Sequence, residues 1–295
     1  MSQSLPVWRS MLFLPAHVEK FVAKAHTRGA DACILDLEDS VPLSQKAEAR
    51  AMVAAGAQTI AAHNIGVLVR VNNDENNLIA DLDAVVNPSV AAIVLPKVND
   101  AAIVALVAER LDALEAKLGM RVGHTYIIAQ IEDVRALPNL DEIAVSSSRL
   151  LGMSLGSEDF SASACMAPIP ETLFAPNQMV AFACRRAGIL PFGFPASIAD
   201  YSDAQAFART VKLASQLGFV GAFCIHPSQA HMLNEGFSPS SEELEHATGL
   251  LAAFAEAERE GRGAFAYKGK MVDPPVVARA EELLRRADAI AARNS

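Results

Sequence analysis

Short apolar runs alternate with longer amphipathic segments through residues 1–236 of the chain. Each run is rich in aliphatic residues and ends at charged, polar, glycine or proline positions, which is typical of buried strands. The runs that we predict as strands lie at 11–14, 32–39, 67–72, 91–97, 127–133, 150–159, 190–196 and 221–226. The seventh run gives the weakest pattern because it is rich in proline and glycine.

The segments between these runs have the spacing of amphipathic helices. The predicted helices cover 17–28, 45–62, 78–86, 100–118, 176–187 and 203–217. Pro176 is well placed as the first residue of its helix. Strands that alternate with helices predict parallel strands joined by helical crossovers, and their number favours a closed (β/α)8 TIM barrel over an open doubly wound sheet. The first strand is not followed by the Gly-x-Gly-x-x-Gly motif of a dinucleotide-binding fold.

The remainder of the chain, 237–295, is not needed to close the barrel and is predicted to be a C-terminal helical extension. Ser240 and Glu243 fit a capping box at the start of its first helix. A loop follows, and Pro274 begins a last helix with apolar residues along one side. We therefore divide the chain into a barrel, 1–236, and an extension that packs on a neighbouring subunit or over the active site.

The composition narrows the class of protein. Hydrophobic residues make up 52% of the chain and charged residues 20%, which indicates a compact globule. The formal net charge of −9 argues against non-specific binding to nucleic acid or to an anionic membrane. The start of the chain lacks a signal-peptide pattern, and the 4 cysteines are scattered without a metal-binding or redox motif, so we expect a cytoplasmic protein.

Polar residues gather where the predicted strands end. Barrel enzymes carry their chemistry at the carboxyl ends of the strands. The residues at these ends are Asp36, Glu38, Asp39, Arg70, Lys97, Glu132, Asp159 and His226. We expect His226 to be a packed, hydrogen-bonded histidine and not a catalyst. The convergence of the other residues on one face predicts an active site there.

Glu132 and Asp159 end neighbouring strands, so both carboxylates can reach one cation. A few protein ligands, all of them oxygen atoms, suit Mg²⁺, which keeps several of its waters. The alternative is that each acid caps the helix that follows it. We favour the metal site for the pair, and we expect the adjacent Asp133 to begin the next helix.

Arg70 ends a strand that carries no other charge, and its guanidinium suits a substrate carboxylate. An ion pair with Asp36 or Glu38 is the alternative, and both interactions can hold at once. We expect the acidic run 36–39 to orient metal-bound waters and to hold Arg70 or Lys97 in place. Lys97 also raises the possibility of Schiff-base chemistry, which the two nearby carboxylates make less favoured.

With these residues assembled, the chain resembles the citrate lyase β-subunit-like enzymes of the HpcH/HpaI aldolase/citrate lyase family, which include malyl-CoA and citramalyl-CoA lyases. The matching segments follow the family's order and lie at 9–15, 36–41, 70–72, 96–97, 132, 156–159, 224–229 and 269–273. They cover nearly the whole chain. The resemblance implies a TIM barrel and homo-oligomers, either trimers or hexamers, in which the C-terminal segment reaches an adjacent subunit's site.

The same resemblance assigns roles to individual residues. It implies that Mg²⁺ is held by Glu132 and Asp159, and that Asp273 in the C-terminal segment is an acid/base group. Asp273, Arg70 and Glu132 would be the catalytic residues. The residues that would contact the substrate are Arg70, Glu132, Arg9 and Lys97.

The chain departs from the usual family pattern in two places. Residues 175–177 read Ala-Pro-Asn where relatives often carry an Ala-Arg pair. Residues 191–197 replace the usual Ile-Asp-x-Val-like segment of the seventh strand. Both segments lie where they could contact the substrate or coenzyme A. We therefore expect the metal chemistry of the family to be retained and the identity of the substrate to vary.

The function that these observations favour is reversible cleavage of a β-hydroxyacyl thioester into a 2-oxo acid and a shorter acyl thioester, with Mg²⁺ as cofactor. The substrate would be an acyl-CoA or the acyl thioester of a carrier protein. One alternative keeps the same site but hydrolyses the thioester. Another is a non-catalytic subunit of a larger acyl-lyase complex.

Overall fold

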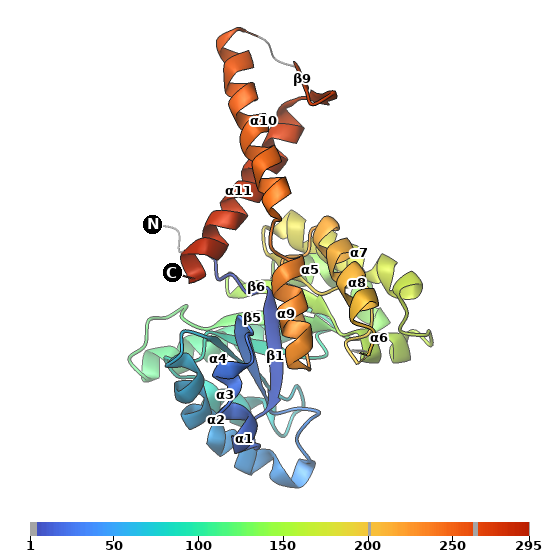
Figure 1. Cartoon of the computed structure of the whole chain (residues 1–295). Helices are drawn as coiled ribbons and strands as arrows, with labels where there is room; N and C mark the ends of the chain where they lie inside the picture. The colour runs from blue at the N-terminus through green and yellow to red at the C-terminus, as the bar shows by residue number, and fades with distance from the viewer. Residues whose placement is uncertain (1–4, 200–201, 262–264, 295) are drawn as a thin grey trace. The chain divides into compact units, whose positions relative to one another are not determined.

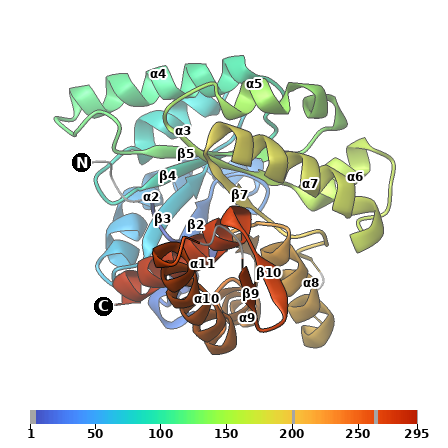
Figure 2. The same ribbon diagram turned by 90° about the horizontal axis from the view of Figure 1, so that it is seen from above.

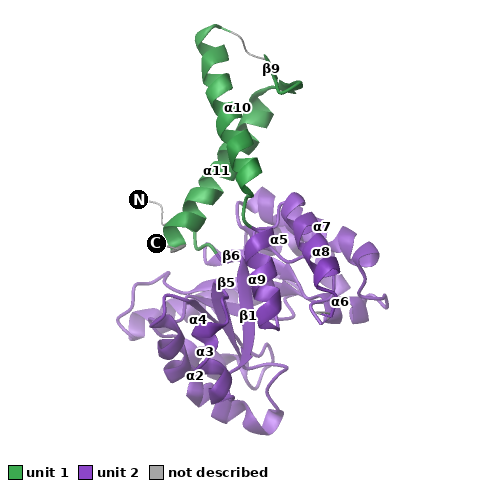
Figure 3. Cartoon of the chain, viewed as in Figure 1, with its two compact units in different colours: residues 1–7, 238–295 green, residues 8–237 purple. Residues whose placement is uncertain are grey.

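The computed structural model describes residues 5–199, 202–261 and 265–294. The chain forms two compact units, which Figure 3 shows in different colours. One unit is Trp8–Phe237, and the other combines Met1–Val7 with Ser238–Ser295. The first unit contains a large parallel sheet, and the second contains two long helices and a β-hairpin.

Among the described residues, eight parallel strands form the centre of the larger unit (Figure 1). They are β1 (Ser10–Pro15), β2 (Ala32–Asp36), β3 (Gly66–Arg70), β4 (Ala92–Leu95), β5 (Tyr126–Ile131), β6 (Leu150–Leu155), β7 (Leu190–Phe192) and β8 (Ala222–Cys224). Hydrogen bonds join them in the order β7-β6-β5-β4-β3-β2-β1-β8. A parallel bridge between Phe192 and Gly221 brings the two sheet edges together, so the barrel is nearly closed. The predicted (β/α)8 architecture is confirmed.

Helices pack on the outside of this sheet, and Figure 2 shows α2, α3, α4, α5 and α7 at its periphery. The helices are α1 (Glu19–Val22), α2 (Lys46–Ala61), α3 (Leu78–Val85), α4 (Ala101–Lys117), α5 (Leu140–Ala144), α6 (Ser157–Ser163), α7 (Pro170–Ala187), α8 (Ala204–Gln216) and α9 (Pro227–Gly236). Short 3-10 helices are η1 (Ala25–Thr27), η2 (Leu43–Gln45) and η3 (Val134–Asn139). In the described ranges, none of the helices is both long and apolar enough to cross a membrane.

Three predicted elements of the larger unit differ from the structure. The strand expected at 150–159 ends at Leu155, so Asp159 lies in α6 and not at the end of a strand. The single helix expected at 17–28 is divided into α1 and η1, because Val22 and Ala25 alone bury a face there, which is too little to stabilise a longer helix. The helix expected to start at Pro176 begins at Pro170, which takes the first helical position. Leu173 is fully buried and anchors this additional turn, so Pro176 lies inside α7.

The strand interiors explain how side chains reach the mouth of the barrel. Side chains on alternate strand positions point inward. Met11, Ile34, Leu68, Val94 and Ile128 form an inner apolar cluster, whereas their strand neighbours pack against the helices. On β5 the inward positions continue from Ile128 to Gln130 and then to Glu132, beyond the end of the strand. The barrel core therefore gives way to polar groups at its carboxyl end.

The smaller unit is built on α10 (Ser241–Arg259) and α11 (Pro274–Asn294). The predicted capping box is present, because the side chains of Ser240 and Glu243 each accept a hydrogen bond from the other residue's backbone N–H. The segment predicted as a loop contains a hairpin of β9 (Phe265–Tyr267) and β10 (Lys270–Val272). Lys268 and Gly269 both have positive φ, as a two-residue type I′ turn requires.

Candidate active site

The carboxyl ends of β2, β3, β4 and β5 bring predicted site residues into one connected group. Asp36 and Arg70 are the last residues of β2 and β3, and they are paired in register. Lys97 and Glu132 follow β4 and β5. Asp36 and Glu132 are buried, whereas the side chain of Lys97 is 49% exposed. The parallel strands therefore collect both signs of charge at one end of the barrel, as the sequence predicts.

Arg70 is held by the acidic run that follows β2. Its Nε lies 2.7 Å from Asp36 Oδ1 and its Nη2 lies 2.9 Å from Asp36 Oδ2, which is a bidentate pair. Its Nη1 lies 3.0 Å from Glu38 Oε2 and 3.4 Å from Asp39 Oδ2. The guanidinium also covers the ring of Phe13, 4.7 Å from the ring centre. Three of its N–H groups thus donate to protein carboxylates, and Glu38 adds an ion pair without a hydrogen bond.

These contacts fix the charges of the group. Although burial raises the pKa of Asp36, the hydrogen bond and charge of Arg70 lower it overall, so Asp36 is ionised. Burial raises the pKa of Glu38 above its ordinary value in spite of Arg70 and Lys97. The same pairing raises the pKa of Arg70, whose burial alone would lower it.

Lys97 links the acidic run to Glu132. Its Nζ contacts Glu38 Oε1, and its backbone N–H donates to Glu132 Oε2 at 2.9 Å. Lys97 has φ +53°, an uncommon conformation for a residue other than glycine, and this conformation accompanies the contact with Glu132. Partial burial lowers the pKa of Lys97, but Glu38 raises it overall, so the amine is protonated. A protonated amine is not a nucleophile, which disfavours the Schiff-base alternative.

Glu132 is 5% exposed and borders on Gly156, the residue after β6. A Cβ atom on Gly156 would lie 2.5 Å from Glu132 Cγ, so only glycine leaves room for this carboxylate. Burial, together with the negative charges of Glu38 and Asp159, raises the pKa of Glu132 to about 8. A buried carboxylate beside two other acids is an environment that a cation would stabilise.

The donor set fits Mg²⁺. Asp159 is the third residue of α6, is exposed, and is near enough for its charge to act on Glu132. Within the described ranges, there is no group of three or more His, Cys, Asp or Glu side chains that could hold a metal ion. Two carboxylates that leave most coordination positions to water and substrate match the preference of Mg²⁺ over that of Zn²⁺.

Helix capping does not account for Glu132. Glu132 accepts its hydrogen bond from Lys97 and not from the helix that follows it. Asp133 is the N-cap of η3 and accepts from the backbone N–H of Arg135 at 2.8 Å, as predicted. Asp159 lies in the first turn of α6, after the N-cap Gly156, where a carboxylate also favours the helix dipole.

Arg9 is not brought to this group, which corrects its expected contact with the substrate. It precedes β1 and therefore lies at the amino end of the strand, opposite the site. It is 8% exposed, and its Nε and Nη2 donate to the carboxylate of Asp31 at 2.8 and 2.9 Å. Arg9 thus ties the amino ends of β1 and β2 together.

Two other predicted residues have local hydrogen bonds of their own. Asp273 belongs to the smaller unit, where it precedes α11 and accepts from the backbone N–H of Val276 at 3.3 Å. His226 is exposed and is the N-cap of α9, with its Nδ1 2.7 Å from Ser228 Oγ. It is hydrogen-bonded as expected, but it is not packed in the interior.

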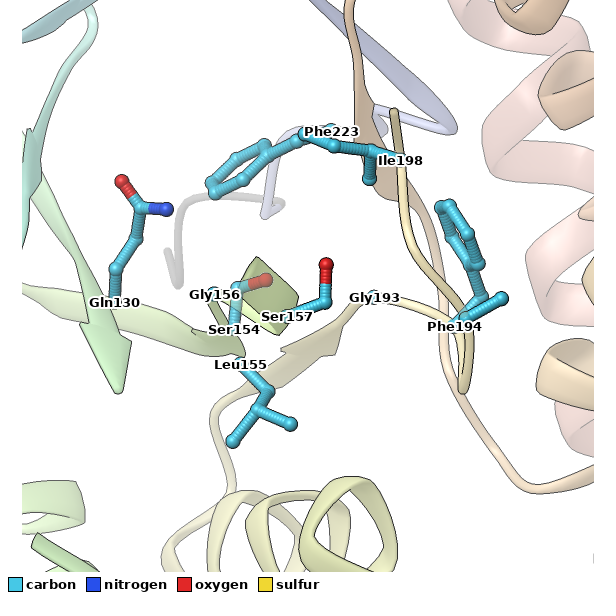
Figure 4. A pocket seen from close by; sticks show the side chains of 10 residues that line it. Gln130, Ser154, Leu155, Gly156, Ser157, Gly193, Phe194, Ile198 and Phe223 are labelled. Atoms are coloured by element: carbon cyan, nitrogen blue, oxygen red, sulfur yellow. The ribbon is translucent and has the colours of Figure 1, made fainter. Parts of the chain in front are cut away.

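Sequence reasoning did not single out Lys46 or the polar residues inside β5 and β6. Lys46 Nζ donates to the carbonyl oxygens of Leu37 and Glu38 at 2.9 Å each and to Asn72 Oδ1 at 2.6 Å. It therefore supports the loop that carries Glu38. Gln130, Ser154 and Ser157 line a pocket at the barrel mouth (Figure 4). In the sequence, Gln130, Ser154 and Ser157 can be recognised as polar residues within or directly after an otherwise apolar run.

The chain is similar to known proteins along nearly its whole length. A citrate lyase β subunit from Leuconostoc mesenteroides is 34% identical over 285 residues, covering 95% of this chain and 93% of the relative. An L-malyl-CoA/β-methylmalyl-CoA lyase from Cereibacter sphaeroides is 33% identical over 301 residues, covering 94% of this chain and 92% of the relative. Among solved structures, protein CitE from Mycobacterium tuberculosis in complex with magnesium, acetoacetate and coenzyme A matches with a TM-score of 0.75 and 29% identity, over 97% of this chain and 99% of that one.

The sequence model of the HpcH/HpaI aldolase/citrate lyase family matches residues 9–227. This range runs from Arg9, before β1, to the first residue of α9 and includes Arg70, Lys97, Glu132 and Asp159. The chain therefore belongs to the HpcH/HpaI aldolase/citrate lyase family.

Proposed function

We propose that the protein is a Mg²⁺-dependent carbon–carbon lyase that cleaves a β-hydroxyacyl thioester into a 2-oxo acid and a shorter acyl thioester. The observation that carries the proposal is the buried carboxylate of Glu132, set between Asp159 and the Arg70–Glu38–Lys97 group at the strand ends. Relatives that cover the chain almost fully are named as citrate lyase β subunits and malyl-CoA lyases. The matching CitE structure holds magnesium and coenzyme A.

In this proposal Glu132 and Asp159 hold Mg²⁺, which when bound would polarise the carbonyl oxygen of the oxo-acid half. Arg70 and Lys97 supply preorganised positive charge beside the enolate that carbon–carbon cleavage produces. Arg70 would accept a substrate carboxylate by giving up its 3.4 Å contact with Asp39, the longest of its ion pairs. Asp36 and Glu38 would keep the guanidinium in place during that exchange.

The smaller unit supplies the proton in this scheme. Asp273 is the proposed acid/base group, and the segment 237–295 would pack on a neighbouring subunit of a homotrimer or hexamer and reach its site. Asp273 directly precedes α11, and the nearby residues Lys270 and Met271 are exposed, which supports this assignment. The protein would work in the cytoplasm on an acyl-CoA or on the thioester of an acyl carrier.

A screen of short β-hydroxyacyl-CoA esters tests the proposed function. We expect release of a 2-oxo acid that depends on Mg²⁺ and is lost in Glu132→Gln, while Glu142→Gln on the exposed face of α5 retains full activity. A hydrolase would instead release the hydroxy acid and free coenzyme A. Turnover by the purified chain alone excludes a purely non-catalytic subunit, and full turnover in excess chelator would refute the metal mechanism.

A further inference from the structure

A pocket at the barrel mouth is not used by the metal chemistry. It lies between the carboxyl ends of β5, β6, β7 and β8, has a cavity volume of about 30 Å³ and is partly open to solvent. Its lining includes Gln130, Ser154, Ser157, Phe194, Ile198 and Phe223 (Figure 4). Of the described residues that line it, not one carries a charge. Its chemistry is therefore that of neutral hydrogen bonds inside an apolar wall.

Two polar atoms of this pocket are buried and lack a hydrogen-bond partner among the described residues. Gln130 and Ser154 are register partners on β5 and β6, and they are 4% and 2% exposed. Ser157 is 7% exposed. Within the described ranges, Gln130 Oε1 and Ser157 Oγ are buried without a hydrogen-bond partner. Buried polar atoms are rarely left in this state, so a ligand or water that supplies the missing hydrogen bonds is expected.

The pocket adjoins the proposed metal ligand. Gly156 lines it, and the same glycine borders on Glu132. Gln130 lies two residues before Glu132 and so points to the same side of β5. A group that extends from the metal-bound end of a substrate would therefore meet Gln130 and Ser157. In the proposed reaction that end is the 2-oxo acid.

One segment that departs from the family pattern, 191–197, lines this pocket, and Asn177 of the other lies next to it. Gly193 follows β7 with φ +132°, and a Cβ atom on it would lie 3.3 Å from Asn177 Oδ1 and 3.6 Å from Ser154 Oγ. Asn177 belongs to α7 and is 1% exposed. Gly193, Phe194 and Ala196 thus line this wall, and Asn177 lies behind Gly193.

From this arrangement we propose that the pocket selects the substituent of the 2-oxo acid and that it takes a short hydroxyl-bearing chain. A hydroxyl both donates and accepts, so it matches an amide and two serine hydroxyls at once. A carboxylate would find no cation there, and a methyl group would leave the buried polar atoms without partners. The inference rests on the proposed function, because it assumes that the oxo acid binds at Glu132.

Calorimetry of oxo-acid binding to the full chain with saturating Mg²⁺ tests this inference without the acyl half. The probes are 3-hydroxypyruvate and pyruvate, which differ by one hydroxyl. We expect 3-hydroxypyruvate to bind about tenfold more tightly, and Ser157→Ala and Gln130→Leu each to remove most of that difference. Ser147→Ala, before the amino end of β6, is the matched control and should leave the ratio unchanged.

The outcomes separate the two proposals. Equal binding of the two probes, or a ratio that survives both substitutions in folded protein, overturns the pocket assignment and leaves the lyase proposal standing. Failure of both oxo acids to bind in the presence of Mg²⁺ overturns the lyase proposal and the pocket assignment with it. Thermal melting of each variant shows whether it is folded, and Ser154→Ala provides a third, smaller change in the same wall.

Discussion

At the scale of single residues, Gly156 leaves the space that the side chain of Glu132 occupies. Its φ is −81°, which any residue can adopt, so the effect of Gly156→Ala would come from the 2.5 Å approach of the new Cβ to Glu132 Cγ. We expect Mg²⁺ affinity to fall at least tenfold, with a loss of about 1–3 kcal/mol in the free energy of unfolding. Titration calorimetry with Mg²⁺ measures the first quantity and urea unfolding the second.

Gly119→Ala is the control for this prediction. Gly119 has φ +66° and an open surrounding, so alanine there would cost backbone strain without touching the site. It should lower stability by about 1 kcal/mol and leave Mg²⁺ affinity unchanged. Equal Mg²⁺ affinity in Gly156→Ala and in the parent protein would show that Glu132 is not a ligand or that its position does not depend on Gly156.

A second residue-scale prediction concerns Lys97. Its amine is paired with Glu38 and protonated, so it should not form an imine with the oxo acid. Borohydride added in the presence of pyruvate should leave the mass of the protein unchanged. Lys97→Ala should lower turnover by roughly 10²-fold through loss of positive charge while retaining Mg²⁺ binding, because the backbone N–H to Glu132 remains. A stable reduced adduct on Lys97 would contradict this account.

At the scale of elements, an ion pair joins α4 to the amino ends of β5 and β6. Glu115 is fully buried, accepts from the backbone N–H of Thr125 and Gly123 at 2.7 Å, and contacts Arg149. Burial alone would raise its pKa, but Arg149 and these backbone donors lower it to about 2. Folding lowers the pKa of Glu115, so its carboxylate stabilises the folded protein fully above the ordinary pKa of about 4.3. This stabilisation is lost as the pH falls toward 2.

This contribution is on the order of 2–3 kcal/mol and should disappear between about pH 4.5 and pH 2. Urea unfolding of the parent protein and of Glu115→Gln, at neutral pH and near the acid end of that window, measures it. The parent should lose its advantage over the variant on acidification. Glu109→Gln, on the exposed side of the same helix, should show the parent's pH dependence. Identical pH profiles of parent and Glu115→Gln would contradict the assignment.

The elements also show what the sequence could predict. Runs such as those of β5 and β6 are apolar because the strands are buried on both faces, so their positions, and Glu132 directly after β5, could be predicted. The start of α7 could not, because the anchoring of Leu173 against the core is a tertiary contact. Gln130 was overlooked because one polar residue in a buried run does not change its periodicity. The position of Arg9 could not be predicted because the start of β1 at Ser10 sets which end of the barrel it occupies.

At the scale of the whole molecule, the lyase proposal divides each active site between two chains. Glu132 lies in the unit Trp8–Phe237, and Asp273 lies in the other unit. If the segment 237–295 serves a neighbouring subunit, a Glu132→Gln chain and an Asp273→Asn chain would each be inactive alone but would complement each other when mixed. A site assembled within one chain could not be restored in this way, because every chain would carry one defect.

The amount of recovered activity follows from the symmetry of a closed ring. With equal amounts of the two variants, half of the sites contain an intact Glu132, and half of those receive Asp273 from a neighbour that carries it, so about a quarter of the parent activity should return. Co-expression followed by an oxo-acid release assay measures the recovery, and light scattering gives the oligomeric state. Activity no greater than that of the parental variants would place both residues in the same chain's site, and undiminished activity of Asp273→Asn alone would remove Asp273 from the mechanism.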